Sequence, residues 1–387
     1  MRSATLLALL PFALAAPSRR AEPAPVLRPR GVKLVDGKYI VKMKGGIRAA
    51  SVSATVSTIE ADADYTYSKS FSGFAASLKD DEVDKLRNDP NLQVEYIEQD
   101  AYISIKATTQ QENAPWGLAR LSSSRAGGKT YTYDESAGEG TCAYIIDTGI
   151  DVEHPDFDGR ATFLKNFAGG SDGDGQGHGT HVAGTIGSTT YGVAKKTSLF
   201  AVKVLGDDGS GTNSAVIAGM DFVAGHSNKK DCPKGTVVNM SLGGEFSSAV
   251  NKAAASIVDA GLFLAVAAGN EAVDASGSSP ASEASACTVG ATTRNDTLAY
   301  YSNFGDVVDV LAPGTDILST WPGGKTNTIS GTSMASPHVA GLAAYFLGLG
   351  QKAEGLCDYI VSAAIDGVVA NVPSGTVNKL INNGVSK

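Results

Sequence analysis

The chain has 387 residues, of which 19% are charged, and a formal net charge of −8 at pH 7. At roughly 100–200 residues per domain, this length predicts two or three folded units. The acidic balance and the dispersed charges argue against nucleic acid or an anionic membrane as partner. After residue 16 no stretch reaches the roughly 18 uninterrupted apolar residues of a membrane-spanning helix, so we expect no membrane partner.

The N-terminus has the features of a secretory signal peptide, which we place at residues 1–15. Arg2 precedes an apolar core that ends in the small-residue pattern Ala13-Leu14-Ala15. We therefore expect a secreted, extracellular protein. In an exported chain the four cysteines predict two disulfides, for which three pairings are open. The Pro- and Arg-rich segment that follows, residues 16–33, is typical of a linker.

A βαββαβ pattern follows the linker, at about residues 37–105. The expected elements are a strand at 38–44, a helix at 47–61, two strands about Gly73, a helix stopped by Pro90 and a last strand at 94–105. This stretch holds no nucleophile grouped with partner residues. It predicts a small α+β module with a folding or binding role.

From about Thr109 short apolar runs alternate with helical segments. The runs of strand length lie at residues 142–150, 198–206, 235–243 and 262–270. Such runs, separated by helices, predict a parallel sheet buried on both faces, with ligands beyond the carboxyl ends of its strands.

Asp147 closes the first run, in Asp147-Thr148-Gly149. A strand-end Asp often only makes a turn. Asp-Thr-Gly is also the sequence of an aspartic protease lobe, but that chemistry needs two carboxylates that share a proton. No second Asp-Thr-Gly or Asp-Ser-Gly occurs in the chain, so we set that alternative aside.

His178 and His181 stand in a Gly-rich turn before an apolar helix. Either could be structural, and the pair could be metal ligands. The common helical zinc motif has its two histidines four residues apart with a Glu between them, and this segment has neither feature.

Ser333 precedes a helix of small residues whose early turns include Pro337, which we expect to be tolerated because early amides lack intrahelical partners. Ser333 could be only a cap, the commoner role. It could also be a nucleophile, because amides at a helix N-terminus can bind an oxyanion. Ser336 lies a turn further in, where packing would shield it.

A serine hydroxyl needs a neutral histidine as base and a carboxylate that fixes the histidine tautomer. Asp147, His178 and Ser333 occur in this chain order at Gly-rich element ends. Asn270 closes the fourth apolar run and offers an amide donor for an oxyanion hole shared with the Ser333 amide.

Four segments resemble the signature blocks of the subtilisin superfamily: "YIIDTGID", "GHGTHVAGT", "AVAAGN" and "SGTSMASPHVAGLAAY". The order Asp, His, Ser is the one known for subtilisin, so it is a match to a relative. Finer segments such as "NAPWGLARLSS" and "LAPGTDILSTW" are similar to the proteinase K-like branch, and "VEYIEQDAYI" resembles its inhibitory propeptide.

The resemblance implies a three-layer α/β subtilisin-like fold with a mostly parallel sheet, preceded by a ferredoxin-like propeptide. It implies a signal peptide at 1–15, a propeptide at 16–106 and a catalytic domain at 107–387. The expected protein is a broad-specificity serine endopeptidase that favours apolar or aromatic residues before the cut and matures by cutting off its own inhibitory propeptide near Lys106-Ala107. A monomer is the default expectation, with proteins or peptides as substrates.

The resemblance also assigns individual residues. Asp147, His178, Ser333 and Asn270 take the triad and oxyanion roles. Further implied positions are the substrate-binding segments Gly209, Ser210, Gly211 and Ser241, Leu242, Gly243; the disulfides Cys142–Cys232 and Cys287–Cys357; and a structural calcium at the Asp309 carboxylate and the Ala284 and Ala286 carbonyls.

Three positions depart from the branch. Val182 stands where a free Cys is common, Asn213 where a Tyr often lids the pocket for the fourth residue before the cut, and Val368 where a second calcium site has an acid, with Asp366 only nearby. We therefore predict one calcium site and make no claim for a second. Of two glycosylation sequons, we expect Asn239 to be buried and Asn295 to be exposed.

Two rival functions stay open from the sequence. A non-catalytic binding protein with this fold would show a damaged triad or oxyanion position, and none is damaged. A metal-dependent hydrolase built on His178 and His181 would lose activity to chelators at once. A triad enzyme needs neutral His178, so its activity should fall below roughly pH 6.5.

Overall fold

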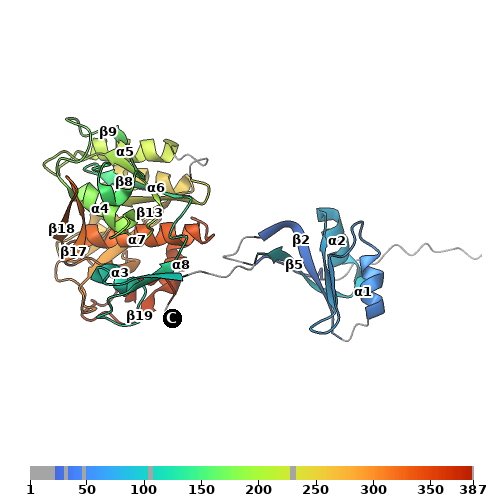
Figure 1. The fold of residues 1–387 in the computed structure, drawn as a ribbon. Coiled ribbons are helices and arrows are strands. Elements are labelled where there is room, and N and C mark those ends of the chain that lie inside the picture. Colours follow the sequence, from blue (N-terminus) through green and yellow to red (C-terminus); the bar gives the residue numbers. More distant parts are fainter. Residues whose placement is uncertain (1–21, 30–33, 46–48, 103–107, 227–231, 386–387) are drawn as a thin grey trace, which may run out of the picture. The chain divides into compact units, whose positions relative to one another are not determined.

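The computed structural model describes residues 22–29, 34–45, 49–102, 108–226 and 232–385. The chain forms two compact units, Met1–Ser104 and Ile105–Lys387 (Figure 1). The expected signal peptide and the expected processing bond after Lys106 lie outside the described residues.

The smaller unit is a five-stranded sheet with two helices. Its elements are β1 (Val26–Leu27), β2 (Leu34–Met43), α1 (Ala49–Val56), β3 (Tyr65–Tyr67), β4 (Gly73–Ser77), α2 (Asp80–Asn88), a 3-10 turn (Pro90–Leu92) and β5 (Val94–Ala101), in the sheet order β1-β5-β2-β4-β3. The βαββαβ pattern is confirmed. The linker prediction is wrong in part, because Val26 and Leu27 pair in parallel with Ile97 and Glu98 of β5. A strand of two residues in a Pro-rich segment is too short to show the alternation of apolar and polar side chains that indicates a strand in a sequence.

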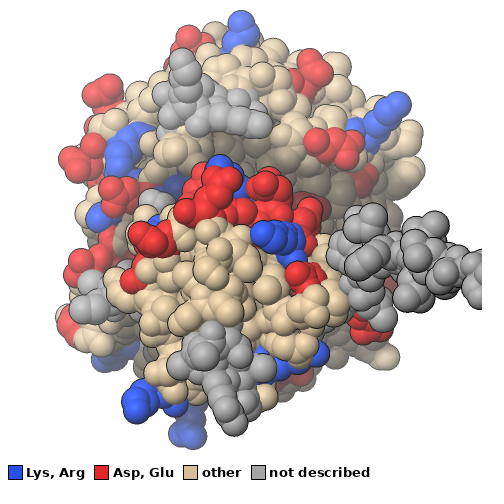
Figure 2. Space-filling view, turned by 90° about the vertical axis from the view of Figure 1, so that its right-hand side faces the viewer, with Lys and Arg blue, Asp and Glu red and all other residues tan. Residues whose placement is uncertain are grey.

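Charge placement explains the start of α2. Three acidic residues, Asp80, Asp81 and Glu82, occupy its first turn, where the helix dipole favours negative charge. The Glu82 carboxylate also accepts a hydrogen bond from the Lys79 amide at 2.9 Å. Figure 2 shows a group of acidic side chains near the centre of the view, with Lys and Arg side chains beside them.

The larger unit is built on a nine-stranded sheet in the order β19-β20-β16-β15-β13-β11-β8-β10-β9. All its pairings are parallel except that of β19 with β20. The strands are β8 (Thr141–Asp147), β9 (Ala161–Asn166), β10 (Ser198–Lys203), β11 (Gly235–Met240), β13 (Phe263–Ala267), β15 (Cys287–Thr292), β16 (Val310–Pro313), β19 (Ile365–Asp366) and β20 (Lys379–Leu380). The four apolar runs of the sequence are β8, β10, β11 and β13.

Side chains of β8 alternate between two cores, as the two-residue period of a strand requires. Ala143 and Ile145 belong to the core that includes residues of α3 (Trp116–Leu121), α4 (His178–Gly187), α7 (Thr332–Gly348) and α8 (Leu356–Ala363). Cys142, Tyr144 and Ile146 pack with α5 (Asn213–His226) and α6 (Ser248–Asp259). Helices therefore cover both faces of the sheet, which confirms the three-layer expectation (Figure 1).

Short elements complete the larger unit. They are the pairs β6 (Thr108–Gln111) with β7 (Tyr131–Asp134), β12 (Gly244–Glu245) with β14 (Ser278–Ser279) and β17 (Ile317–Trp321) with β18 (Lys325–Ile329), and 3-10 turns at Pro155–Phe157 and Ala275–Gly277. Both implied disulfides, Cys142–Cys232 and Cys287–Cys357, are formed. Among the described residues no helix is long and apolar enough to cross a membrane.

Candidate active site

The carboxyl end of β8 brings an acid and an imidazole into contact. Asp147, its last residue, is fully buried. Its Oδ1 accepts the Thr148 amide at 2.7 Å and lies 2.8 Å from Nδ1 of His178, the first residue of α4. Because a carboxylate only accepts, Nδ1 carries the proton. The other ring nitrogen, Nε2, is then free to act as a base.

Two opposed effects set the pKa of His178. Burial lowers it, but the charge of Asp147 and its hydrogen bond raise it more, and the charge of Asp174 adds to the rise. The net result is a pKa above the ordinary 6.5. The expected loss of activity in acid therefore begins at a higher pH than the sequence alone predicts.

Asp174, which the sequence analysis did not single out, holds the turn before His178. Its Oδ1 accepts from the Thr148 hydroxyl and the Gly177 amide, each at 2.8 Å, and its Oδ2 accepts from the Thr180 amide at 2.9 Å and hydroxyl at 2.6 Å. The acid four residues before His178 in "DGDGQGH" was the available signal.

Ser333 is the second residue of α7, and its hydroxyl donates to the Ser241 carbonyl at 3.1 Å. Pro337 is the sixth helical residue and not an early one, so our reason for its tolerance was wrong. Lacking an N–H, it leaves the Ser333 carbonyl four residues back without a helical donor. The Ser241 hydroxyl supplies that hydrogen bond at 2.8 Å. The proline thus lets Ser241 hold the backbone of Ser333.

Ser336 is fully buried and donates to Asn239 Oδ1 at 2.8 Å. The Asn239 amide in turn donates to the Ser241 hydroxyl at 2.9 Å. The prediction that packing shields Ser336 is confirmed, and so is the burial of the Asn239 sequon.

Asn270 is exposed beside the start of α7. Its Oδ1 accepts the Thr332 amide at 2.8 Å and the Thr332 hydroxyl at 3.0 Å. With the oxygen committed to these bonds, the amide nitrogen is the end that can donate to a substrate. The Ser333 amide lies in the first turn of α7, where amides lack intrahelical partners.

Two adjoining cavities share the wall Leu242–Gly244. One, of about 460 Å³, is lined by His178, by Gly209–Gly211 and by Ser241. The other, of about 390 Å³, is lined by Ser333 and Asn270. The structure therefore gathers His178, Ser333, Asn270 and the predicted substrate-binding residues along two adjoining cavities, with Asp147 buried against His178.

Comparison with protein families gives two matches. The model described as "Subtilase family" matches residues 138–367, and the one described as "Peptidase inhibitor I9" matches residues 38–106. The chain belongs to the subtilase family.

Named relatives agree. This subtilase is 73% identical over 291 residues to "Proteinase T" of Parengyodontium album, covering 75% of this chain and 99% of that protein. It is 54% identical to the "Cuticle-degrading protease" of Metarhizium anisopliae over 99% of this chain and all of that one. A solved "cold adapted subtilisin-like serine proteinase" is 42% identical, with a TM-score of 0.67 over 70% of this chain and 99% of that one. The subtilase is a serine endopeptidase of the proteinase K-like branch.

His181 of this subtilase is not placed as a metal ligand. It is fully buried, and its Nε2 lies 2.9 Å from the Ile317 carbonyl and 3.2 Å from that of Asn327. Because Nε2 faces two acceptors, it carries the proton. Burial lowers the pKa of His181 to about 4. No histidine belongs to a potential metal-binding group among the described residues.

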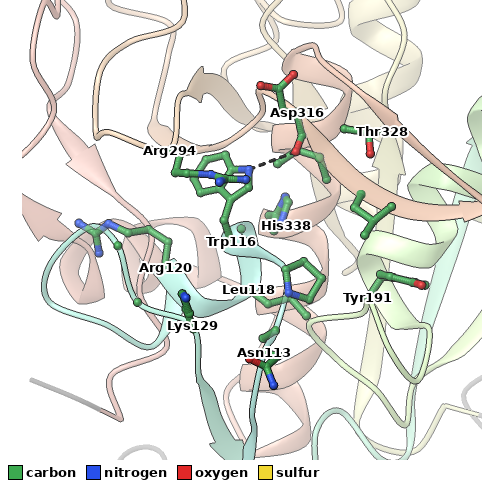
Figure 3. Close-up of a pocket in the computed structure, with 17 residues that line it drawn as sticks. Asn113, Trp116, Leu118, Arg120, Lys129, Tyr191, Arg294, Asp316, Thr328 and His338 are labelled. Atoms are coloured by element: carbon green, nitrogen blue, oxygen red, sulfur yellow. Dashed lines mark hydrogen bonds between the residues drawn. The ribbon is translucent and has the colours of Figure 1, made fainter.

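The subtilase has a larger cavity elsewhere, of about 550 Å³. Figure 3 shows it between Trp116, Tyr191, Asp316 and His338, with the Trp116 indole N–H donating to the Asp316 carbonyl at 3.2 Å. None of the triad residues lines it. Size alone therefore does not mark the catalytic site.

A fourth cavity, of about 500 Å³, is lined by Ala284, Ala286 and Asp309, the residues implied for calcium. Glu354 and Asp358 also border it, and no Lys, Arg or His is among the described residues that line it. Burial, with a smaller contribution from the charge of Asp358, raises the pKa of Asp309 to about 6. A cation would relieve this penalty, so the residues fit calcium, which prefers oxygen ligands.

Proposed function

We propose that Ser333 attacks the scissile carbonyl while His178 takes its proton at Nε2 and Asp147 holds the imidazole through Nδ1. The observation that carries this assignment is the 2.8 Å contact between Asp147 Oδ1 and His178 Nδ1. His178 lines a cavity together with Ser241, whose hydroxyl donates to the Ser333 carbonyl at 2.8 Å. The Asn270 side-chain amide and the Ser333 amide bind the oxyanion of the acyl-transfer step.

The substrate peptide adds as a strand between Gly209–Gly211 and Ser241–Gly243. Gly211 is needed for packing within this segment, because a Cβ there would clash with the Val204 carbonyl. The side chain before the cut enters the cavity beside Ser333, whose walls include Ala267 and Ala268. We expect an apolar or aromatic preference there and little aromatic selection at the exposed Asn213.

The chain is made as a secreted zymogen, with a signal peptide at 1–15, a propeptide at 16–106 and the mature enzyme at 107–387. The inhibitor match at 38–106 and the division into units at 104/105 support these bounds. Two disulfides agree with an oxidising destination. The mature enzyme acts as a monomer, and Asn295, in an exposed turn, carries any glycan.

A structural calcium is held by Asp309 and by the Ala284 and Ala286 carbonyls. We infer no second site: Asp366 is ion-paired with Lys379 at 3.3 Å, and Val368 packs against an apolar cluster. Calcium should raise the Tm of the inactive S333A chain, and adding D309N to S333A should abolish that rise. An equal rise in D309N would contradict the site.

The catalytic assignment is tested by labelling with a fluorophosphonate probe. Wild type should be labelled at Ser333, S333A should not, and S336A, if folded, should keep the label as the matched control. Labelling of S333A at the wild-type rate would contradict the assignment. Immediate loss of wild-type labelling on addition of EDTA would also contradict it.

A further inference from the structure

Lys203 is a buried cation close to the triad that the proposed mechanism leaves without a role. It is the last residue of β10 and stands opposite Asp147 in the sheet register. Its side chain is 1% exposed, and its Nζ donates to the Thr148 carbonyl at 2.6 Å and to Asp207 Oδ1 at 3.0 Å. A buried ammonium is costly unless its donors are satisfied, so these two oxygens are held where the strand places Nζ.

The first contact leads to the triad. Thr148 donates its amide to Asp147 Oδ1 at 2.7 Å, the same oxygen that faces His178. Its hydroxyl donates to Asp174 at 2.8 Å and accepts the Gly179 amide at 2.9 Å. By holding the Thr148 carbonyl, Lys203 fixes the peptide unit that orients the catalytic carboxylate.

The second contact leads to the substrate edge. Asp207 lies in the turn that closes through the Gly206 amide and the Ser210 carbonyl at 2.8 Å, and this turn includes the first two residues of the proposed substrate-binding segment Gly209–Gly211. Its carboxylate also packs against Gly175 in the turn before His178, where any Cβ would clash with it. The hydrogen bond from Lys203 and its charge lower the pKa of Asp207, which favours the ionised carboxylate.

We propose that Lys203 is a positioning residue that couples occupation of the Gly209–Gly211 edge to the alignment of Asp147 and His178. This inference rests on the proposed function. A peptide bound along Gly209–Gly211 immobilises the 206–210 turn. The hydrogen bonds that join Asp207, Lys203 and Thr148 then restrict the position of the Asp147 carboxylate. Binding energy from residues remote from the cut is then expressed in kcat, and not in KM alone.

The test compares two p-nitroanilide substrates, acetyl-Phe and succinyl-Ala-Ala-Ala-Phe, of which only the longer one reaches the Gly209–Gly211 edge. The measured quantity is the ratio of their kcat values at saturation, per site titrated with fluorophosphonate. The variants are K203M, K203R and D207N. K195M is the matched control, because Lys195 is also buried and donates to two carbonyls, those of Thr189 and Thr190, outside the cleft.

We expect K203M to lower the long-to-short kcat ratio about 10-fold and D207N about 3-fold, with partial recovery in K203R and a change below 2-fold in K195M. D207N keeps the test decisive if K203M does not fold, because Asp207 is 51% exposed. If D207N leaves the long-to-short kcat ratio unchanged, because kcat is unaffected or falls equally on both substrates, the proposed coupling is wrong. Failure of the wild type to label at Ser333 would instead contradict the proposed function.

Discussion

The cleft around His178 and the larger cavity around His338 each place an imidazole beside empty space, yet only one is built for proton transfer. His178 is half-buried and paired with Asp147, which raises its pKa. His338 is 2% exposed, its Nδ1 donates to the Met334 carbonyl at 2.8 Å, and burial lowers its pKa to about 4. A carboxylate partner, and not cavity volume, distinguishes His178, the proposed catalytic base, from His338.

Removing the carboxylate should erase the difference between the two histidines. In D147N we expect kcat to fall about 10⁴-fold, because the amide can no longer hold the Nδ1–H tautomer or stabilise the imidazolium. The measurement is kcat on a peptide substrate with the concentration of folded enzyme verified by circular dichroism. A loss below 10-fold would show that Asp147 is not the orienting group.

Loss of the oxyanion donor should have the next largest effect. N270A is expected to lower kcat about 100- to 1000-fold with a small change in KM, since the lost interaction forms mainly in the transition state. Steady-state kinetics separate the two constants. An increase in KM with kcat unchanged would assign Asn270 to ground-state binding instead.

The raised pKa of His178 predicts the pH profile. Protonated His178 cannot accept the Ser333 proton, so kcat/KM should be lost as pH falls through a pKa above 6.5. D174N removes one of the negative charges that raise this pKa, so its midpoint should lie at lower pH. A midpoint in D174N at or above the wild-type value would contradict the electrostatic account.

Substitution of the structural histidine should have the smallest effect on activity. H338Q is expected to keep kcat/KM within about 2-fold and to lower stability by about 1–2 kcal/mol through the lost hydrogen bond. Between pH 6.5 and about 4, His338 is protonated in the unfolded chain but neutral in the folded protein. The free energy of unfolding therefore decreases as the pH falls through this range. In an S333A background, calorimetry should show a shallower acid loss in H338Q. A large loss of kcat/KM in H338Q would contradict the conclusion that His338 has only a structural role.

The fold could be predicted from the sequence wherever an apolar run was long enough to indicate a whole strand. The apolar runs that became β8, β10, β11 and β13 each extended over a full strand, and their polar ends marked the cleft. The two-residue strand β1 was hidden in a Pro-rich run, because only its pairing with β5 defines it.

The site was accessible where motifs were local. Asp147, His178, Ser333 and Asn270 each stood at a recognisable element end. The contact of Lys203 with Thr148 depends on β8 and β10 being neighbours, and Asp174 contacts Thr148 across 26 residues of chain, neither of which one sequence reveals. The single lysine within the apolar run 198–206 was the available signal for Lys203. The role of Pro337 was misjudged because the donor that replaces its missing amide, Ser241, lies 92 residues from Ser333.

The most direct test of the account is the mass of the protein released by a protease-deficient host that expresses wild type or S333A. If Ser333 is the nucleophile, wild type loses its propeptide and digests casein, whereas S333A stays at precursor mass without its signal peptide and leaves casein intact. If S333A matures and still cuts casein, the nucleophile assignment is wrong.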